Sequence, residues 1–315
     1  MSSHPISRRD AIKAGVVASL AWGSSLPAFS EEKKSLPAIT KPIPSSGEQL
    51  PVIGLGTNVY GVKTDAEKAP LREVLEKMWE AGGKVIDTAQ AYGRSEVVIG
   101  ELLKDLGNRD KYFIATKTPI QGDYSNPQAV IDKSFHDLQV DKIDLLQIHQ
   151  LGGLDQMLPA LFKAKEAGRI RYVGMSTSSD EHYDRTMATM KKFPLDFIQV
   201  DYSIDNRNAA QAILPLAQER KIAVLINVPF GGRRKAASTF SKVANIPLPE
   251  WAAEFDATSW AQFFLKYVVS HPAINTAIPG TTKAKHMLDN QGAGRGRLPD
   301  EAMRRKIEQY WDSLS

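Results

Sequence analysis

Short apolar runs, rich in β-branched residues, alternate with amphipathic segments eight times from residue 53 onward. Each run has the length of a buried strand, and the segments between the runs place apolar residues three and four positions apart, as a helix requires. The predicted strands are Ile53–Thr57, Lys84–Thr88, Tyr112–Lys117, Ile143–His149, Ile170–Ser176, Phe197–Ser203, Ile222–Val228 and Ile274–Pro279. Strict alternation of strand and helix predicts a parallel sheet covered by helices.

Eight such units favour the α/β class and, within it, a closed (β/α)8 TIM barrel of one domain over an open sheet. We expect this domain to cover residues 46–315, after a linker over residues 31–45, and to end in an added helix over residues 298–314. The stretch over residues 231–258 is long for a plain connection, so we expect it to serve binding. The glycines near residue 54 do not complete a dinucleotide fingerprint, which argues against a Rossmann fold.

Residues 1–30 follow a different pattern. Arg8 and Arg9 precede an uncharged stretch over residues 14–30 that ends in small residues. This is the layout of an export signal, and the arginine pair resembles a twin-arginine (Tat) signal peptide. The stretch is shorter than the roughly 20 apolar residues of a spanning helix, so we do not expect a permanent membrane anchor. We therefore predict cleavage near Glu31, use of the Tat export machinery and a periplasmic location. The alternative is an amphipathic helix of a cytosolic protein.

The composition of the chain excludes several kinds of reactive or metal-binding site. The 315 residues carry a net charge of +4, which gives no argument for a nucleic-acid partner. The chain has no cysteine, which excludes a thiol nucleophile, a cysteine-ligated metal and a disulfide framework. The six histidines are scattered without metal-ligand spacing, so we expect no metal site.

Four polar side chains stand at or just after predicted strand ends: Asp87, Tyr92, Lys117 and His149. In a closed barrel, the carboxyl ends of the strands converge on one pocket. A lysine about 4 Å from a tyrosine hydroxyl favours the phenolate by roughly 4 kcal/mol at an effective dielectric near 20. Asp87 would keep Lys117 charged, and His149 would bond the substrate oxygen. Tyr92 would then act as general acid toward a carbonyl oxygen.

The segment over residues 87–100, DTAQAYGRSEVVIG, resembles the signature segment of the aldo-keto reductases. Similar segments follow in family order at Ile114–Lys117, Asp144–His149, Val173–Ser176 and Ile278–Thr281. The likeness covers nearly all of residues 40–315. It implies a (β/α)8 barrel that binds NADPH in an extended pose without a Rossmann domain, with Asp87, Tyr92, Lys117 and His149 as catalytic tetrad.

The resemblance also implies a set of cofactor contacts. They are Ser176, Thr177, Gln199, Asn227, Val228, Phe230, Gly280, Thr281, Lys283, His286, Asp289 and Asn290. Thr177 stands where the family usually has asparagine, and Asn227 stands where many members carry a tyrosine that stacks on the nicotinamide. The usual basic residue for the 2′-phosphate is replaced, with Lys283, Lys285 and His286 as candidates. NADP(H) is therefore the expected cofactor, with NAD(H) as the alternative.

Three residues in the long stretch after the seventh strand, Arg233, Arg234 and Lys235, form either a solvated run or a phosphate clamp. Three aromatic residues, Tyr60, Trp251 and Trp260, lie near the presumed pocket face, and we expect one of them to line the pocket.

The resemblance implies an enzyme that reduces an aldehyde or ketone with hydride from a nicotinamide cofactor, or oxidises the corresponding alcohol. Two alternatives stay open at this point. One is a cofactor-binding sensor or partner protein with little turnover. The other is a lyase that forms a Schiff base on Lys117.

Overall fold

The computed structural model describes residues 36–232 and 239–314. Residues 36–315 form one compact unit. The predicted signal peptide over residues 1–30 and the basic run at residues 233–235 lie outside the described residues. No helix in the described ranges is long and apolar enough to cross a membrane.

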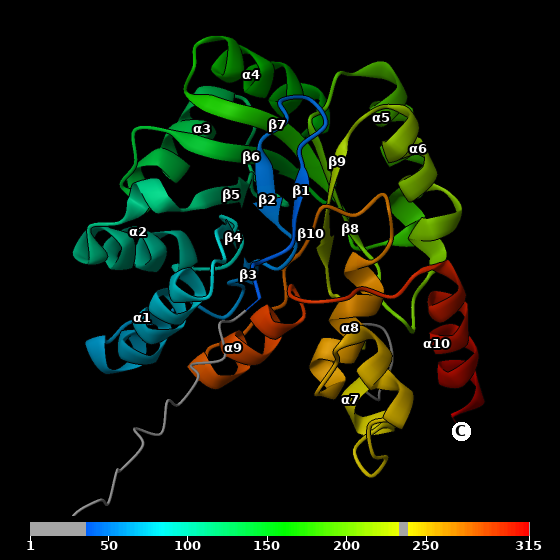
Figure 1. Ribbon diagram of the computed structural model, residues 1–315. Coiled ribbons are helices and arrows are strands. Elements are labelled where there is room, and N and C mark those ends of the chain that lie inside the picture. The colour runs from blue at the N-terminus through cyan, green and yellow to red at the C-terminus, as the bar shows by residue number, and fades with distance from the viewer. Residues whose placement is uncertain (1–35, 233–238, 315) are drawn as a thin grey trace, which may run out of the picture. The chain divides into compact units, whose positions relative to one another are not determined.

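Eight parallel strands form the barrel at the centre of this unit (Figure 1). They are β3 (Leu55–Gly56), β4 (Val85–Asp87), β5 (Phe113–Lys117), β6 (Ile143–His149), β7 (Ile170–Ser176), β8 (Phe197–Asp201), β9 (Ala223–Asn227) and β10 (Thr276–Ala277). Each strand pairs with its neighbour in sequence order. Parallel bridges from Ile53 to Ala277 and from Gly56 to Gly280 join the two edges of the sheet. All eight predicted strands are confirmed, and so is the TIM barrel.

Helices surround the strands as an outer layer (Figure 1). They are α1 (Asp65–Glu80), α2 (Ser95–Leu106), α3 (Pro127–Leu138), α4 (Leu154–Glu166), α5 (Tyr183–Lys192), α6 (Ile213–Glu219), α7 (Thr239–Lys242), α8 (Trp260–Val269), α9 (Ala284–Gly292) and α10 (Glu301–Ser313). Helix α10 is the added C-terminal helix that the sequence predicts. The long stretch after β9 contains α7 and a 3₁₀ segment over Glu250–Phe255.

Alternation along each strand separates two apolar layers. In β5, Phe113 and Ala115 belong to the layer inside the barrel, whereas Ile114 packs in the layer between the strands and the helices. Because side chains alternate between the faces of a strand, Lys117 shares the inward face with Phe113. This parity directs Lys117 into the barrel and Thr116 toward the helices.

A hairpin that the sequence analysis did not predict closes one end of the barrel. Strands β1 (Thr40–Pro42) and β2 (Gln49–Pro51) pair antiparallel, and β1 lies inside the predicted linker. Ile43 and Leu50 from this hairpin are buried in the same apolar layer as Phe113, inside the barrel. The hydrophobic pattern does not predict this hairpin, because strands of only three residues are too short to show a clear alternation.

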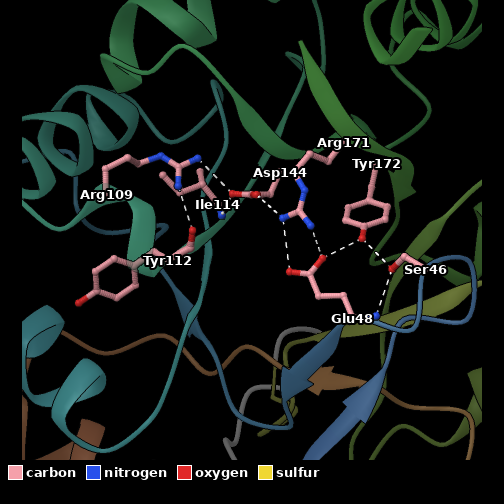
Figure 2. A network of polar contacts seen from close by, with 8 residues as sticks. All are labelled: Ser46, Glu48, Arg109, Tyr112, Ile114, Asp144, Arg171 and Tyr172. Carbon is pink, nitrogen blue, oxygen red and sulfur yellow. Dashed lines mark hydrogen bonds and ion pairs between the residues drawn. The ribbon is translucent and has the colours of Figure 1, made fainter. Parts of the chain in front are cut away.

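A network of polar contacts ties the hairpin to the amino-terminal ends of the barrel strands (Figure 2). Its members are Ser46, Glu48, Arg109, Tyr112, Ile114, Asp144, Arg171 and Tyr172. Arg171 donates to Asp144 Oδ1 at 2.7 Å and also pairs with Glu48 of the hairpin. Asp144 accepts further hydrogen bonds from Arg109 at 3.1 Å and from the Ile114 amide at 2.8 Å. Arg171 is therefore the link between the hairpin and the barrel.

We expect Arg171→Met to lower the free energy of unfolding by about 1–3 kcal/mol, because it removes charge-assisted hydrogen bonds to two carboxylates. Urea denaturation measures this. Arg185→Met is the matched control, since Arg185 and its partner Asp155 are 57% and 82% exposed and such pairs contribute little. Equal stability of the two variants would contradict the assigned role.

Candidate functional site

A buried ion pair lies at the carboxyl ends of two neighbouring strands. Lys117 Nζ donates to Asp87 Oδ2 at 2.6 Å and to the Thr88 carbonyl at 2.8 Å. The side chains of Lys117 and Asp87 are 1% and 3% exposed. Strands β4 and β5 pair in register with Asp87 opposite Ala115, so the two charges approach from adjacent strands. Each of these buried charges needs the other, because removing one partner would leave the other charge uncompensated inside the barrel.

Tyr92 and His149 complete the cluster. Lys117 Nζ lies 5.1 Å from the centroid of the Tyr92 ring, close enough for Tyr92 to help raise the pKa of Lys117. The rings of Tyr92 and His149 meet edge to face with centroids 5.8 Å apart. His149 ends β6, and its amide donates to Thr118 Oγ1. The structure therefore brings the four predicted catalytic residues together.

Electrostatics keep the lysine protonated. Burial by itself would lower the pKa of Lys117, but the charge of Asp87 and the contact with Tyr92 raise it above its usual value. Burial raises the pKa of Asp87, and the Lys117 ammonium opposes this shift. The protonated lysine thus places a positive charge beside the tyrosine that could act as general acid.

The local sequence explains how Tyr92 reaches this position. The Tyr92 amide donates to the Ala89 carbonyl, and the Ser95 amide donates to the Tyr92 carbonyl, so the segment forms consecutive turns. Gly93 has φ +62°, which favours glycine. Ser95, the first residue of α2, is fully buried and donates to the Thr57 carbonyl at 2.9 Å. The start of α2 thus fixes the tyrosine turn against the strand ends.

A cavity of about 400 Å³ opens at these side chains. Six of the predicted cofactor residues line it: Ser176, Gln199, Asn227, Val228, Phe230 and Gly280. A second cavity, of about 440 Å³, is lined by Phe230 and Gly280 again and by four others: Thr281, His286, Asp289 and Asn290. Phe230 and Gly280 belong to both linings, so the two cavities adjoin. The arrangement offers one continuous site with the tetrad at one end.

Two predicted cofactor residues line neither cavity. Thr177 Oγ1 lies 3.1 Å from His182 Nδ1 and bonds Ser179, so its hydroxyl is occupied within its own loop. Lys283 is the residue before α9, and its amide donates to Thr281 Oγ1 at 3.1 Å. Their predicted contacts receive no support from this geometry.

The three aromatic residues that the sequence analysis places near the pocket occupy different positions in the structure. Trp260 lines the second cavity, and its indole donates to the Ile246 carbonyl at 2.9 Å. Tyr60 is fully buried and bonds the Thr281 carbonyl. Trp251 packs against Phe263 in the outer core. Trp260 is thus the one of the three that reaches a cavity.

Two glutamines that the sequence analysis missed belong to the site. Gln147 is buried inside the barrel and donates to Gln199 Oε1 at 3.0 Å. Gln150 lines the catalytic cavity, has φ +51° and donates to Ser178 Oγ at 2.6 Å. The sequence could have indicated both residues, because Gln147 lies within the strand that ends in His149 and Gln150 follows that strand directly. Gln150 links the ends of β6 and β7.

The end of β9 carries a residue with a strained backbone and a buried acceptor that has no hydrogen bond. Val228 has φ +48°, a conformation that costs a β-branched residue of order 1–3 kcal/mol. The preceding Asn227 donates to the Thr177 carbonyl at 3.2 Å, while its buried Oδ1 has no hydrogen-bond partner in the structure. An acceptor in this state at the wall of the cavity suits a ligand with an N–H donor.

A larger cavity, of about 750 Å³, lies at the opposite end of the barrel. Its lining includes Arg109, Asp144 and Arg171 of the network in Figure 2 and none of the tetrad. Residues at the amino-terminal end of a TIM barrel generally serve stability, whereas chemistry occurs at the carboxyl ends of the strands. We therefore assign the catalytic site to the smaller cavity.

Comparison with known proteins agrees with this assignment. The sequence profile of the Aldo/keto reductase family matches residues 52–311. Aldo-keto reductase YhdN of Bacillus subtilis is 33% identical over 204 residues, which are 58% of this chain and 60% of that protein. Probable aldo-keto reductase 1 of Glycine max is 27% identical over 311 residues, which are 85% of this chain and 88% of that protein.

The fold has close relatives among solved structures. An aldo-keto reductase from Klebsiella pneumoniae in complex with NADPH superposes with a TM-score of 0.69 at 23% identity. The match covers 88% of this chain and 96% of that chain. At this identity the likeness concerns the fold. The family profile spans most of the chain and includes the whole tetrad, and the chain therefore belongs to the aldo/keto reductase family.

Proposed function

We propose that this protein reduces an aldehyde or ketone to an alcohol, or catalyses the reverse oxidation, with a nicotinamide cofactor. The observation that carries the proposal is the buried Lys117–Asp87 pair at 2.6 Å beside the phenol of Tyr92. When bound, the cofactor supplies or accepts a hydride. The protein residues manage the proton at the substrate oxygen.

Each tetrad residue has a separate role. Tyr92 gives a proton to the carbonyl oxygen during reduction and takes it back during oxidation. His149 lies edge to face with Tyr92 and hydrogen-bonds the same oxygen, which orients the carbonyl in the cavity. Lys117 stabilises the phenolate that remains, and Asp87 holds Lys117 in place.

The residues at the cavity fit a nicotinamide cofactor. Asn227 Oδ1 is a buried acceptor without a partner, and a carboxamide N–H donor matches it. Ser176 and Gln199 add polar groups to the same wall. The adjoining cavity, with Trp260 and His286 in its lining, would hold the distal part of an extended cofactor. The Klebsiella pneumoniae structure of the same fold contains NADPH, which supports NADP(H) as the cofactor.

Titration tests this proposal directly. We expect NADPH to quench the tryptophan fluorescence, because Trp260 lines the adjoining cavity. We expect a panel of aldehydes and ketones to be reduced at the expense of NADPH. A parallel titration with NADH determines the cofactor preference. Absence of binding by both cofactors would refute the proposal.

The two alternative functions receive less support. A Schiff-base lyase needs a lysine that loses its proton easily, whereas the Asp87 carboxylate holds Lys117 protonated. A cofactor-binding sensor needs no proton donor, yet the complete tetrad is assembled around the cavity. Borohydride trapping of substrate on Lys117 would favour the lyase, and cofactor binding without turnover would favour the sensor.

We further propose that the protein is exported through the Tat machinery to the periplasm. The support is the arginine pair Arg8–Arg9 followed by an uncharged stretch over residues 14–30. Because Tat carries folded proteins, the cofactor can be loaded before transport. N-terminal sequencing of the exported protein should begin near Glu31, and recovery of Met1 or Ser2 there would contradict the proposal.

A further inference from the structure

Glu96 is a buried acid to which the proposed reaction assigns no role. It is 2% exposed and is the second residue of α2, four residues after Tyr92. A buried carboxyl group is costly unless hydrogen bonds satisfy it. The Thr116 hydroxyl does so here: Thr116 Oγ1 donates to Glu96 Oε1 at 2.6 Å. The nearby Ser134 hydroxyl also lowers the pKa of the same carboxyl group.

These contacts close a ring around the segment that carries Tyr92. At the start of the segment, Gln90 Nε2 donates to Ser134 Oγ at 2.8 Å, and the Gln90 amide donates to the Lys117 carbonyl at 3.2 Å. At its end, Glu96 accepts from Thr116, and the Ser134 hydroxyl lies near enough to lower the pKa of Glu96. We name Gln90, Glu96, Thr116 and Ser134 the outer ring. Both ends of the tyrosine segment therefore meet the same serine of α3 and bond adjacent residues of β5.

The outer ring lies behind the catalytic lysine. Thr116 shares the outward face of β5 with Ile114, whereas Lys117 shares the inward face with Phe113. The ring thus contacts neither cavity but fixes the two backbone segments on which Tyr92 and Lys117 stand. A change in the ring alters the separation of these two side chains, and catalytic rates respond steeply to such displacements.

We propose that Glu96 is a positioning residue whose buried side chain closes the outer ring and sets the separation between Tyr92 and Lys117. The inference deepens the proposed function and rests on it. Burial raises the pKa of Glu96, and the hydroxyls of Thr116 and Ser134 oppose this only in part. The charged groups that face it are Lys133 and Asp137 of α3, which pair with each other.

Three variants separate the outcomes. Glu96→Gln keeps an acceptor for Thr116 and a donor for Ser134 without a charge. Glu96→Ala opens the ring. Glu101→Gln is the matched control, because Glu101 lies on the same helix, pairs with Lys68 at 2.7 Å and is 31% exposed. If Glu96→Ala does not fold, Thr116→Val opens the ring more gently by removing one hydroxyl.

We expect Glu96→Gln and Glu101→Gln to keep kcat within about threefold of the wild type. We expect Glu96→Ala to lower kcat by about 10–100-fold while the NADPH dissociation constant stays unchanged. The pH midpoint of the kcat profile should move upward, because Lys117 then stabilises the phenolate less. Thr116→Val should lower kcat and raise the pH midpoint as well, but each by less than Glu96→Ala does.

A second readout does not depend on turnover. The phenolate absorbance of Tyr92, isolated by subtracting the Tyr92→Phe titration, should appear at higher pH in Glu96→Ala than in the wild type. If ring-opening variants lose only thermal stability, the role is purely structural and the proposal is wrong. If Glu96→Gln is as damaged as Glu96→Ala, the hydrogen bonds that glutamine preserves do not set the separation of Tyr92 and Lys117, and the proposal is also wrong. If the wild type reduces no carbonyl compound, the proposed function fails while the absorbance titration still judges the ring.

Discussion

Replacing Tyr92 by phenylalanine should lower kcat for carbonyl reduction by about 10²–10⁴-fold, the usual contribution of a general acid. The Tyr92 ring keeps its edge-to-face contact with His149, whose ring centroid lies 5.8 Å away, because phenylalanine preserves the ring. Tyr92 lines the catalytic cavity, and Lys117 Nζ lies 5.1 Å from the centroid of its ring. Loss of the hydroxyl removes the proton donor and leaves the cavity shape intact. The measurement is the rate of NADPH oxidation with a reactive aldehyde.

Cofactor affinity provides the control for this variant. Ser176, Gln199 and Asn227 stand on β7, β8 and β9, away from the tyrosine turn, so NADPH should bind Tyr92→Phe within about threefold of the wild type. Fluorescence titration measures this. Unchanged turnover in Tyr92→Phe would show that another group donates the proton, and the tetrad assignment would then be wrong.

Replacing Lys117 by methionine should have the largest effect on stability. The change leaves the Asp87 carboxylate, whose side chain is 3% exposed, without its counter-ion inside the barrel. Removal of one partner of a buried ion pair typically costs about 3–5 kcal/mol. Urea denaturation should show this loss, and carbonyl reduction should disappear because the phenol also loses its cationic neighbour.

A double variant separates the two effects. Asp87→Asn together with Lys117→Met removes both charges, so most of the lost stability should return while activity stays absent. Lys133→Met is the matched control, because Lys133 is 57% exposed and forms an ion pair with Asp137 along one helix. If Lys117→Met were as stable as Lys133→Met, the 2.6 Å pair would not hold the site together as we describe.

The two ends of the barrel contribute differently to stability and to catalysis. At the amino-terminal end, Arg171 and Asp144 join the hairpin to the strands and contact no part of the catalytic cavity. At the carboxyl-terminal end, the Lys117–Asp87 pair serves both purposes, because it is buried and also adjoins Tyr92. Variants at the first end should change stability alone, and variants of the pair should change both.

The order of strands and helices could be predicted because it depends on local periodicity. The bounds of β6 and β7 agree with the sequence prediction residue for residue, since these strands are long runs buried on both faces. The shorter β3 and β10 are only two residues long in the structure, although their apolar runs are longer. Hydrogen bonding across the barrel, which the periodicity does not report, sets where these strands begin and end.

The chain sequence by itself determined the alternation of eight units and the residue types at the strand ends, including Asp87, Lys117 and His149. Tertiary structure alone decided that β1 and β2 close the barrel, that Thr177 turns into its own loop, and that two cavities adjoin at Phe230. The physical reason is the range of the interactions. A strand or a helix follows from neighbours a few residues apart, whereas a cavity wall or a buried hydrogen bond forms between residues that meet only when the chain has folded.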